Sequence, residues 1–192
     1  MANFGLSKPW IAELNAENDT YSKGFKCGSA MSTAVTPNFN EASLYADNQQ
    51  KEYVKEFKNA TVAVGVDRIP IKASPILFGH TVAEDEEETS KSEDSSNYVG
   101  YGFITAEQVD GVKKYRACVL LKVKFSEGEE SFTTKGDNIV FSAPTLSGIA
   151  IANNSGEWRK KSPYYATEDE ADKWIQNLLG VKEEAGTENT EG

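Results

Sequence analysis

The chain of 192 residues is long enough for one domain with a full hydrophobic core. Its two cysteines and single histidine are too few for a disulfide framework or for chemistry built on histidine. A net charge of −10 argues against attractive nucleic-acid binding, because such binding depends on Lys and Arg neutralising phosphates. No apolar run reaches the roughly 18 residues of a membrane-spanning helix, and the N-terminus lacks a signal-peptide pattern, so we expect synthesis in a cytoplasm and no membrane partner.

Two segments hold nearly all of the negative charge. Residues 83–97 contain seven acids against Lys91, and residues 182–192 contain four acids against Lys182. Both are poor in apolar residues, so burial would not offset the entropy lost on ordering them. We therefore expect one β domain over residues 1–180 that includes a mobile acidic loop at 83–97, followed by a disordered acidic tail at 181–192.

The N-terminal part is rich in residues that favour strands. Pro37 restricts its strand to positions near a sheet edge, because proline cannot donate to the ladder. Residues 36–48 mix turn-forming residues with aromatic ones, which indicates a long projecting loop or hairpin. The runs expected to be extended are 10–14, 29–38, 42–46, 53–58 and 61–66.

The clearest strand signal lies in the middle of the chain. A short helix is expected at 72–78, and a strand at 98–104 precedes the Asp110-Gly111 step, which is typical of a tight hairpin turn. From 112 to 125 apolar residues alternate with polar ones, which predicts one buried face and one wet, basic face. That basic face would carry Lys114, Arg116, Lys122 and Lys124.

Further strands and one well-specified helix follow. Strand-like runs between polar turns at 131–135, 138–152 and 157–165 favour a meander in a sandwich or part-barrel. Thr167 and Glu170 form a capping-box pattern that starts a helix over 168–179, and Gly180 stops it. The apolar stripe of this helix consists of Ala171, Trp174, Ile175 and Leu178.

No set of residues matches a catalytic, cofactor or metal template. The carboxylates cluster in the expected mobile loop, where nothing would fix their geometry, and no phosphate-binding glycine motif is present. We expect no enzyme activity, no cofactor and no metal. From the residues alone, the chain is a mainly β domain with a flanking C-terminal helix and a long projecting loop or hairpin.

Several phrases of the sequence resemble the major tail proteins of long-tailed, non-contractile phages and prophages of Gram-positive bacteria. The resemblance covers roughly residues 4–180, its most specific part is Leu-Tyr-Ala-Asp-Asn at 44–48, and residues 84–94 are the least similar. The phrases are FGLSKPWIA at 4–12, VTPNFNEASLYADN at 35–48, YVGYGF at 98–103, VKFSEGEE at 123–130, and the helix that begins ATE at 166–168.

The resemblance implies a virion protein that polymerises as stacked hexameric rings into a tail tube. Its partners would be other copies of itself, the tape measure protein, and the tail terminator and distal tail proteins, and DNA would pass through without sequence-specific binding. A projecting segment would contact a neighbouring subunit. By this analogy the interface residues are Phe39, Leu44, Tyr45, Ala46, Asp47 and Asn48.

Two other interpretations remain open. A monomeric β-sandwich that recognises a surface or carbohydrate would need clustered exposed aromatic side chains, for which Trp158, Tyr164 and Tyr165 are candidates. A tube protein of a contractile tail or a secretion system would share the same architecture. In either tube, we expect the basic strand face to point outward or into a subunit contact, away from the bore.

Overall fold

The computed structural model describes residues 3–128 and 143–181. The predicted strand at 131–135 and the acidic tail after Val181 lie outside these residues. The strands are β1 Asn3–Asn15, β2 Thr20–Lys26, β3 Ala30–Ala46, β4 Gln49–Val66, β5 Thr81–Val82, β6 Glu88–Thr89, β7 Tyr98–Val109, β8 Val112–Glu127, β9 Thr145–Ala150 and β10 Arg159–Lys161. The helical elements are the 3-10 turn Ile71–Ala73, α1 Ser74–Leu77 and α2 Glu168–Leu178.

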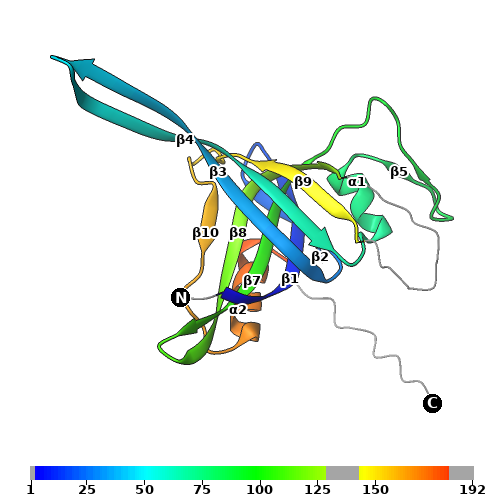
Figure 1. Ribbon diagram of the computed structural model, residues 1–192. Helices are drawn as coiled ribbons and strands as arrows, with labels where there is room; N and C mark the ends of the chain where they lie inside the picture. Colours follow the sequence, from blue (N-terminus) through cyan, green and yellow to red (C-terminus); the bar gives the residue numbers. More distant parts are fainter. Residues whose placement is uncertain (1–2, 129–142, 182–192) are drawn as a thin grey trace, which may run out of the picture.

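One large antiparallel sheet makes up the body of the protein and curls into a part-barrel (Figure 1). Its strand order is β2-β1-β7-β8-β9-β4-β3, with β10 paired to β8. Strands β5 and β6 form a separate two-stranded sheet. The predicted fold class, mainly β with a flanking C-terminal helix, is confirmed. Pro37 lies on β3, which is an edge strand of the sheet, as its sequence position predicts.

Two hydrophobic cores lie on opposite faces of the sheet. The inner core fills the curl of the part-barrel, where Tyr101 and Phe125 are fully buried. The second core lies under α2, where Ile175 and Leu179 pack on Ala117 and neighbouring residues. Both faces of the central strands are therefore covered, which makes β7 and β8 the centre of the fold.

Helix α2 begins with the predicted capping box. Glu170 N–H donates to the Thr167 hydroxyl, while the Glu170 carboxylate accepts from the Thr167 N–H. The buried carboxylate of Asp172 then ties the helix to β1, because it accepts from Trp10 Nε1 at 2.7 Å and from Lys8 Nζ at 2.8 Å. The helix thus has both an apolar and a polar attachment to the sheet.

The β7–β8 hairpin has the predicted Asp110-Gly111 turn, with positive φ at both residues. The prediction of a single basic face on β8 is wrong. Between the pairs Val99↔Val123 and Tyr101↔Leu120 the register shifts by one residue, so β8 carries a bulge at 121–122. Before the bulge Cys118 and Leu120 face the inner core, and after it Val123 and Phe125 do.

The bulge distributes the four basic residues over both faces of the sheet. Lys114 and Arg116 share the inner face with Cys118, whereas Lys122 and Lys124 lie on the outer face. The middle of β8 is buried on both sides, so the predicted wet face is interrupted there. Alternating polarity alone could not reveal this, because one inserted residue inverts every later position.

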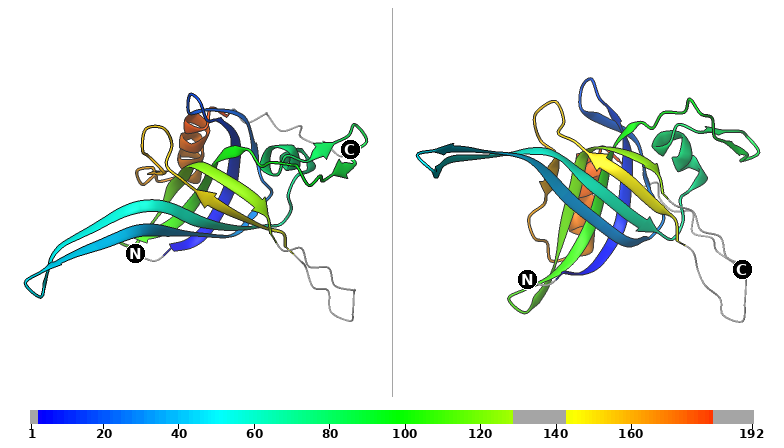
Figure 2. Two further views of the ribbon diagram at one scale, coloured as in Figure 1. Left: turned by 90° about the horizontal axis from the view of Figure 1, so that it is seen from above. Right: turned by 45° about the horizontal axis from the view of Figure 1, so that its top comes forward.

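The acidic segment forms a small lobe at one end of the body (Figures 1 and 2). Strands β5 and β6 pair Thr81 with Thr89 and Val82 with Glu88, and residues 83–93 are exposed throughout. Below them, the buried His80 ring places Nδ1 2.7 Å from Glu88 Oε1. The segment predicted as a mobile loop therefore contains a short hairpin, whose side chains enter neither core.

Candidate functional site: the projecting hairpin

The outer half of the β3–β4 hairpin, residues 39–57, extends away from the body, and we call it the arm (Figure 1). Asp47 and Asn48 close it in a two-residue turn, with φ of 52° and 60°. Positive φ at both positions is the geometry that matches the twist of a hairpin, and Asp and Asn tolerate it better than most residues. The turn therefore sets the pairing of Ala46 with Gln49 and hence of the whole arm.

The arm is more regular than the sequence indicated. The separate runs expected at 29–38, 42–46, 53–58 and 61–66 are parts of two continuous strands. Register shifts at Asn38/Phe39 and Leu44/Tyr45 let the long ribbon twist without breaking. Of the two structures foreseen for 36–48, a projecting loop or a hairpin, the chain forms the hairpin.

Apolar side chains project from both faces of the arm. Leu44 lies on one face with Val54, and Tyr45 lies on the other face with Tyr53, because residues directly opposite in an antiparallel pair share a face. A hairpin at the surface of a monomer usually has one polar face. These four apolar side chains of the arm are largely exposed to solvent. Their exposed fractions are 59% for Leu44, 67% for Tyr45, 51% for Tyr53 and 44% for Val54.

The six candidate interface residues do not have equal surroundings. Leu44, Tyr45 and Ala46 are exposed near the tip, and Asp47 and Asn48 form the turn itself. Phe39 instead lies at the base of the arm. Its ring meets the Phe57 ring edge-on at 6.3 Å, and the Lys55 ammonium lies 4.4 Å from its centre.

Tyr53 and Val54 were not among the predicted interface residues. They lie in the run 53–58, which is expected to be extended, but the pairing of this run with 42–46 was not predicted. The signal that could have found them is the Asp47-Asn48 step between two strand-like runs, because a two-residue turn there places Tyr53 opposite Ser43 and Val54 opposite Ala42. Strand β4 also contributes a surface ion pair, Lys55 to Glu41 at 2.8 Å, whose hydrogen bond lowers the pKa of Glu41 and favours this register.

Along the arm, β3 and β4 pair only with each other. Strand β9 pairs with β4 from Ala60 onward, so both outer edges of the arm lack a strand partner within the described residues. Unpaired backbone N–H and C=O groups at an edge favour pairing with another chain. Exposed apolar side chains and open edges thus occur on the same element.

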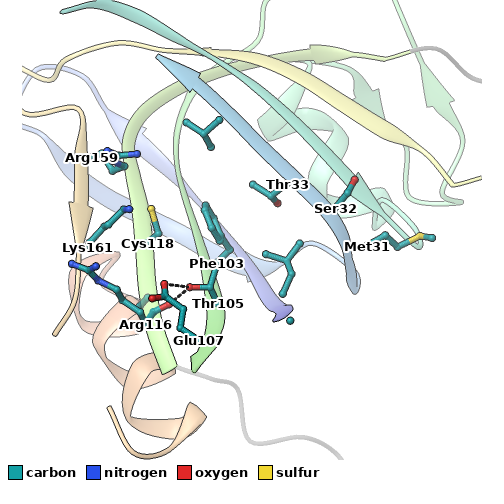
Figure 3. A pocket seen from close by; sticks show the side chains of 14 residues that line it. Met31, Ser32, Thr33, Phe103, Thr105, Glu107, Arg116, Cys118, Arg159 and Lys161 are labelled. Carbon is teal, nitrogen blue, oxygen red and sulfur yellow. Dashed lines mark hydrogen bonds between the residues drawn. The ribbon is translucent and has the colours of Figure 1, made fainter. Parts of the chain in front are cut away.

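A pocket of about 560 Å³ opens on the inner face of the part-barrel, between the start of β3 and strands β8 and β10 (Figure 3). Its β8 and β10 wall carries three cations, Arg116, Arg159 and Lys161. The opposite wall includes the start of β3, where the Thr33 hydroxyl shares a hydrogen bond of 2.7 Å with the Tyr101 hydroxyl. We call these three cations and the space they line the basic pocket.

One carboxylate lines the basic pocket, and it already has partners. Glu107 accepts a hydrogen bond from the Tyr164 hydroxyl at 2.7 Å and a longer one from Thr105 at 3.4 Å. Arg116 donates through Nε to the Ser162 carbonyl at 3.0 Å. Within the described residues, neither Arg159 nor Lys161 forms an ion pair, and the Arg159 guanidinium lies 4.3 Å from the centre of the Trp158 ring.

The groups with possible chemistry are scattered. Cys27 and Cys118 are free and buried in the inner core, and burial raises the pKa of Cys27 to about 12. Over residues 3–128 and 143–181, no three His, Cys, Asp or Glu side chains gather closely enough to bind a metal ion. In the same ranges, no helix has the length and apolar character needed to cross a membrane.

The aromatic side chains proposed for a binding platform are dispersed. Trp158 stacks on Phe57 with ring centres 4.5 Å apart, and Tyr165 bridges to Tyr115 beside α2. Tyr164 bonds Glu107 at the basic pocket. All three rings therefore contact their own chain.

Comparisons with known proteins leave the family open: no protein-family model matches the chain, and none of the curated proteins matches it.

Proposed function

We propose that this chain is a structural virion protein, the subunit of the tail tube of a long-tailed, non-contractile phage. In this proposal, subunits form hexameric rings that stack into a hollow conduit for the tape measure protein and DNA. The observation that carries the proposal is the arm, which exposes apolar side chains on both faces and has no strand partner at either backbone edge among the residues that the structure describes.

The arm suits a contact with a second copy of the chain. Burying one large apolar side chain contributes about 1.5–3 kcal/mol, so the four exposed side chains near the tip can offset much of the cost of association. A ring closed by symmetry also satisfies each open edge with a neighbour, which a free monomer cannot do. Phe39 would then support the base of the arm, and Leu44 and Tyr45 would enter the neighbour.

The charge of the chain supports a conduit as well. A net charge of −10 repels phosphates, so DNA could slide past the wall without adhering to it. Terminator and distal tail proteins would close the two ends of such a tube.

The proposal is tested by negative-stain electron microscopy of the purified chain, first dilute and then concentrated. We expect rings or tubes with a central hole from the unaltered chain. Leu44→Asp combined with Tyr45→Asp should give a folded monomer, because two carboxylates would have to be buried at the contact. Tubes from this double variant would contradict the role of the arm.

A matched control removes two exposed apolar side chains elsewhere. Ile71→Asp combined with Val112→Asp adds the same charge outside the arm, and tubes should persist. If the unaltered chain remains monomeric at every concentration, the monomeric binding module becomes the better interpretation. Tubes alone would not separate a non-contractile tail from a contractile tail or a secretion system.

A further inference from the structure

The tip of the β5–β6 lobe, residues 84–87, presents four successive carboxylates. Ala83 N–H donates to the Glu87 carbonyl at 2.9 Å and Glu86 N–H to the Ala83 carbonyl at 3.1 Å, so a tight turn holds them together. All four residues are exposed, and none forms an ion pair within the described part of the chain. We call Glu84, Asp85, Glu86 and Glu87 the acidic tip.

The basic pocket carries the opposite charge. Arg159 and Lys161 pair with Leu120 and Cys118 on β8, so both point to the inner face, where Arg116 also lies. The single carboxylate there, Glu107, is hydrogen-bonded to Tyr164 and Thr105. Among the described residues, the pocket lining therefore carries three cations against one carboxylate, a positive excess in a protein whose net charge is −10.

The two features lie at opposite ends of the body. In Figures 1 and 2 the β5–β6 lobe is on one side and β10 on the other, with the sheet between them. The acidic tip therefore does not reach the basic pocket of its own chain. A second copy can bring them together, in a head-to-tail contact of the kind that generates rings or filaments.

We infer that the acidic tip of one copy binds the basic pocket of a neighbouring copy. This inference rests on the proposed function, in which copies of the chain assemble through the arm. It adds a second contact between copies, and this contact is electrostatic. Opposite charges attract across such a contact, and like charges placed there cost several kcal/mol, so the pair would fix the register between copies. Salt should weaken it, because the screening length is about 8 Å at physiological ionic strength.

A charge-exchange experiment tests this inference in the full chain. The pocket variant is Arg159→Glu with Lys161→Glu, the tip variant is Glu84→Lys with Glu87→Lys, and the combined variant carries all four changes. Self-association is measured by analytical ultracentrifugation, and particle shape by electron microscopy. We expect the pocket variant and the tip variant each to associate at least about tenfold more weakly, and the combined variant to recover most of the loss.

The matched control is Lys160→Glu with Lys173→Glu. It makes the same change in charge, and Lys160 pairs with Val119, whose side chain faces α2, so it points away from the pocket. Association of this control should stay within about threefold of the unaltered chain. A pocket variant no weaker than the control, or a combined variant no tighter than either single-sided one, would overturn the inference.

The two proposals fail in different ways. Tubes that form equally well in all charge variants would overturn the tip-to-pocket contact and leave the tail-tube proposal intact. Charge-dependent association into particles without a central hole would keep the contact and contradict the tube. A chain that never associates would overturn both.

Discussion

Asp172 shows how a single buried carboxylate fixes α2 on the sheet. It is 3% exposed and receives hydrogen bonds from the Trp10 indole and the Lys8 ammonium. Partial burial lowers the pKa of Lys8, but the hydrogen bonds and charges of Asp172, Asp169 and Glu168 together outweigh it and raise that pKa above 10.5. On the alkaline side, the contribution of Lys8 to stability is therefore complete up to its ordinary pKa of 10.5 and is lost as the pH rises through the higher folded-state pKa.

We expect Asp172→Ala to lower the free energy of unfolding by about 2–4 kcal/mol, because it leaves the buried Trp10 N–H without an acceptor and Lys8 with only its longer contact to Asp169. Asp172→Asn should cost less, since an amide oxygen can still accept from Trp10. Asp169→Ala is the control, as that exposed carboxylate lies 3.4 Å from Lys8 and should contribute under about 1 kcal/mol. Urea unfolding measures all three, and equal losses for Asp172→Ala and Asp169→Ala would refute this role.

At the scale of elements, features that depend on neighbouring residues could be predicted from the sequence. Features that depend on contacts between distant strands could not. The capping box of α2 and the Asp110-Gly111 turn depend on residues within a few positions of each other, so their patterns are complete in the sequence. The bulge at 121–122 depends on the register in which β8 pairs with β7, and no local sequence motif at these residues predicts it. The hairpin candidate was found, but the basic pocket was not, because β3, β8 and β10 contribute to it from distant parts of the chain.

Among the elements, the β5–β6 lobe should be separable from the fold. Deleting residues 84–94 removes no side chain of either core, so we expect the thermal midpoint to change by less than about 5 °C. The deletion does remove the Glu88 partner of His80, whose hydrogen bond lowers the pKa of Glu88. Differential scanning calorimetry measures the midpoint, with His80→Gln in the full chain showing the cost of that pair alone. A fall much larger than that of His80→Gln would mean that the lobe is part of the cooperative unit.

At the scale of the whole molecule, charge is segregated. The acidic residues of 83–97 lie at one end, and the cations of the basic pocket face the inner side of the sheet at the other. The molecule is therefore electrically polar, and two copies attract or repel depending on their orientation. Lys122 and Lys124, which face outward, lie near the Tyr98 ring at 4.9 and 5.6 Å and do not extend the basic pocket.

We expect no measurable binding of DNA at physiological salt, despite the basic pocket. Nucleic-acid affinity grows with the number of phosphates neutralised, and the negative charge elsewhere opposes their approach. Fluorescence anisotropy of a labelled duplex, titrated with assembled and unassembled protein, measures this. Saturable binding that falls steeply with salt would contradict the picture of a non-adhesive conduit.

The arm also bears on the order in which the chain folds. Strands β3 and β4 are consecutive and joined by two residues, so every contact within the arm is local, whereas β1 must find β7 across about half of the chain. Local hairpins close in about 1–10 μs, and distant strand pairs form later because their loops cost more entropy to close. The arm is thus expected to form before the body that carries it, so the nascent chain displays its most adhesive surface earliest. Productive assembly then depends on the body closing faster than two arms meet, which favours slow synthesis and low subunit concentration.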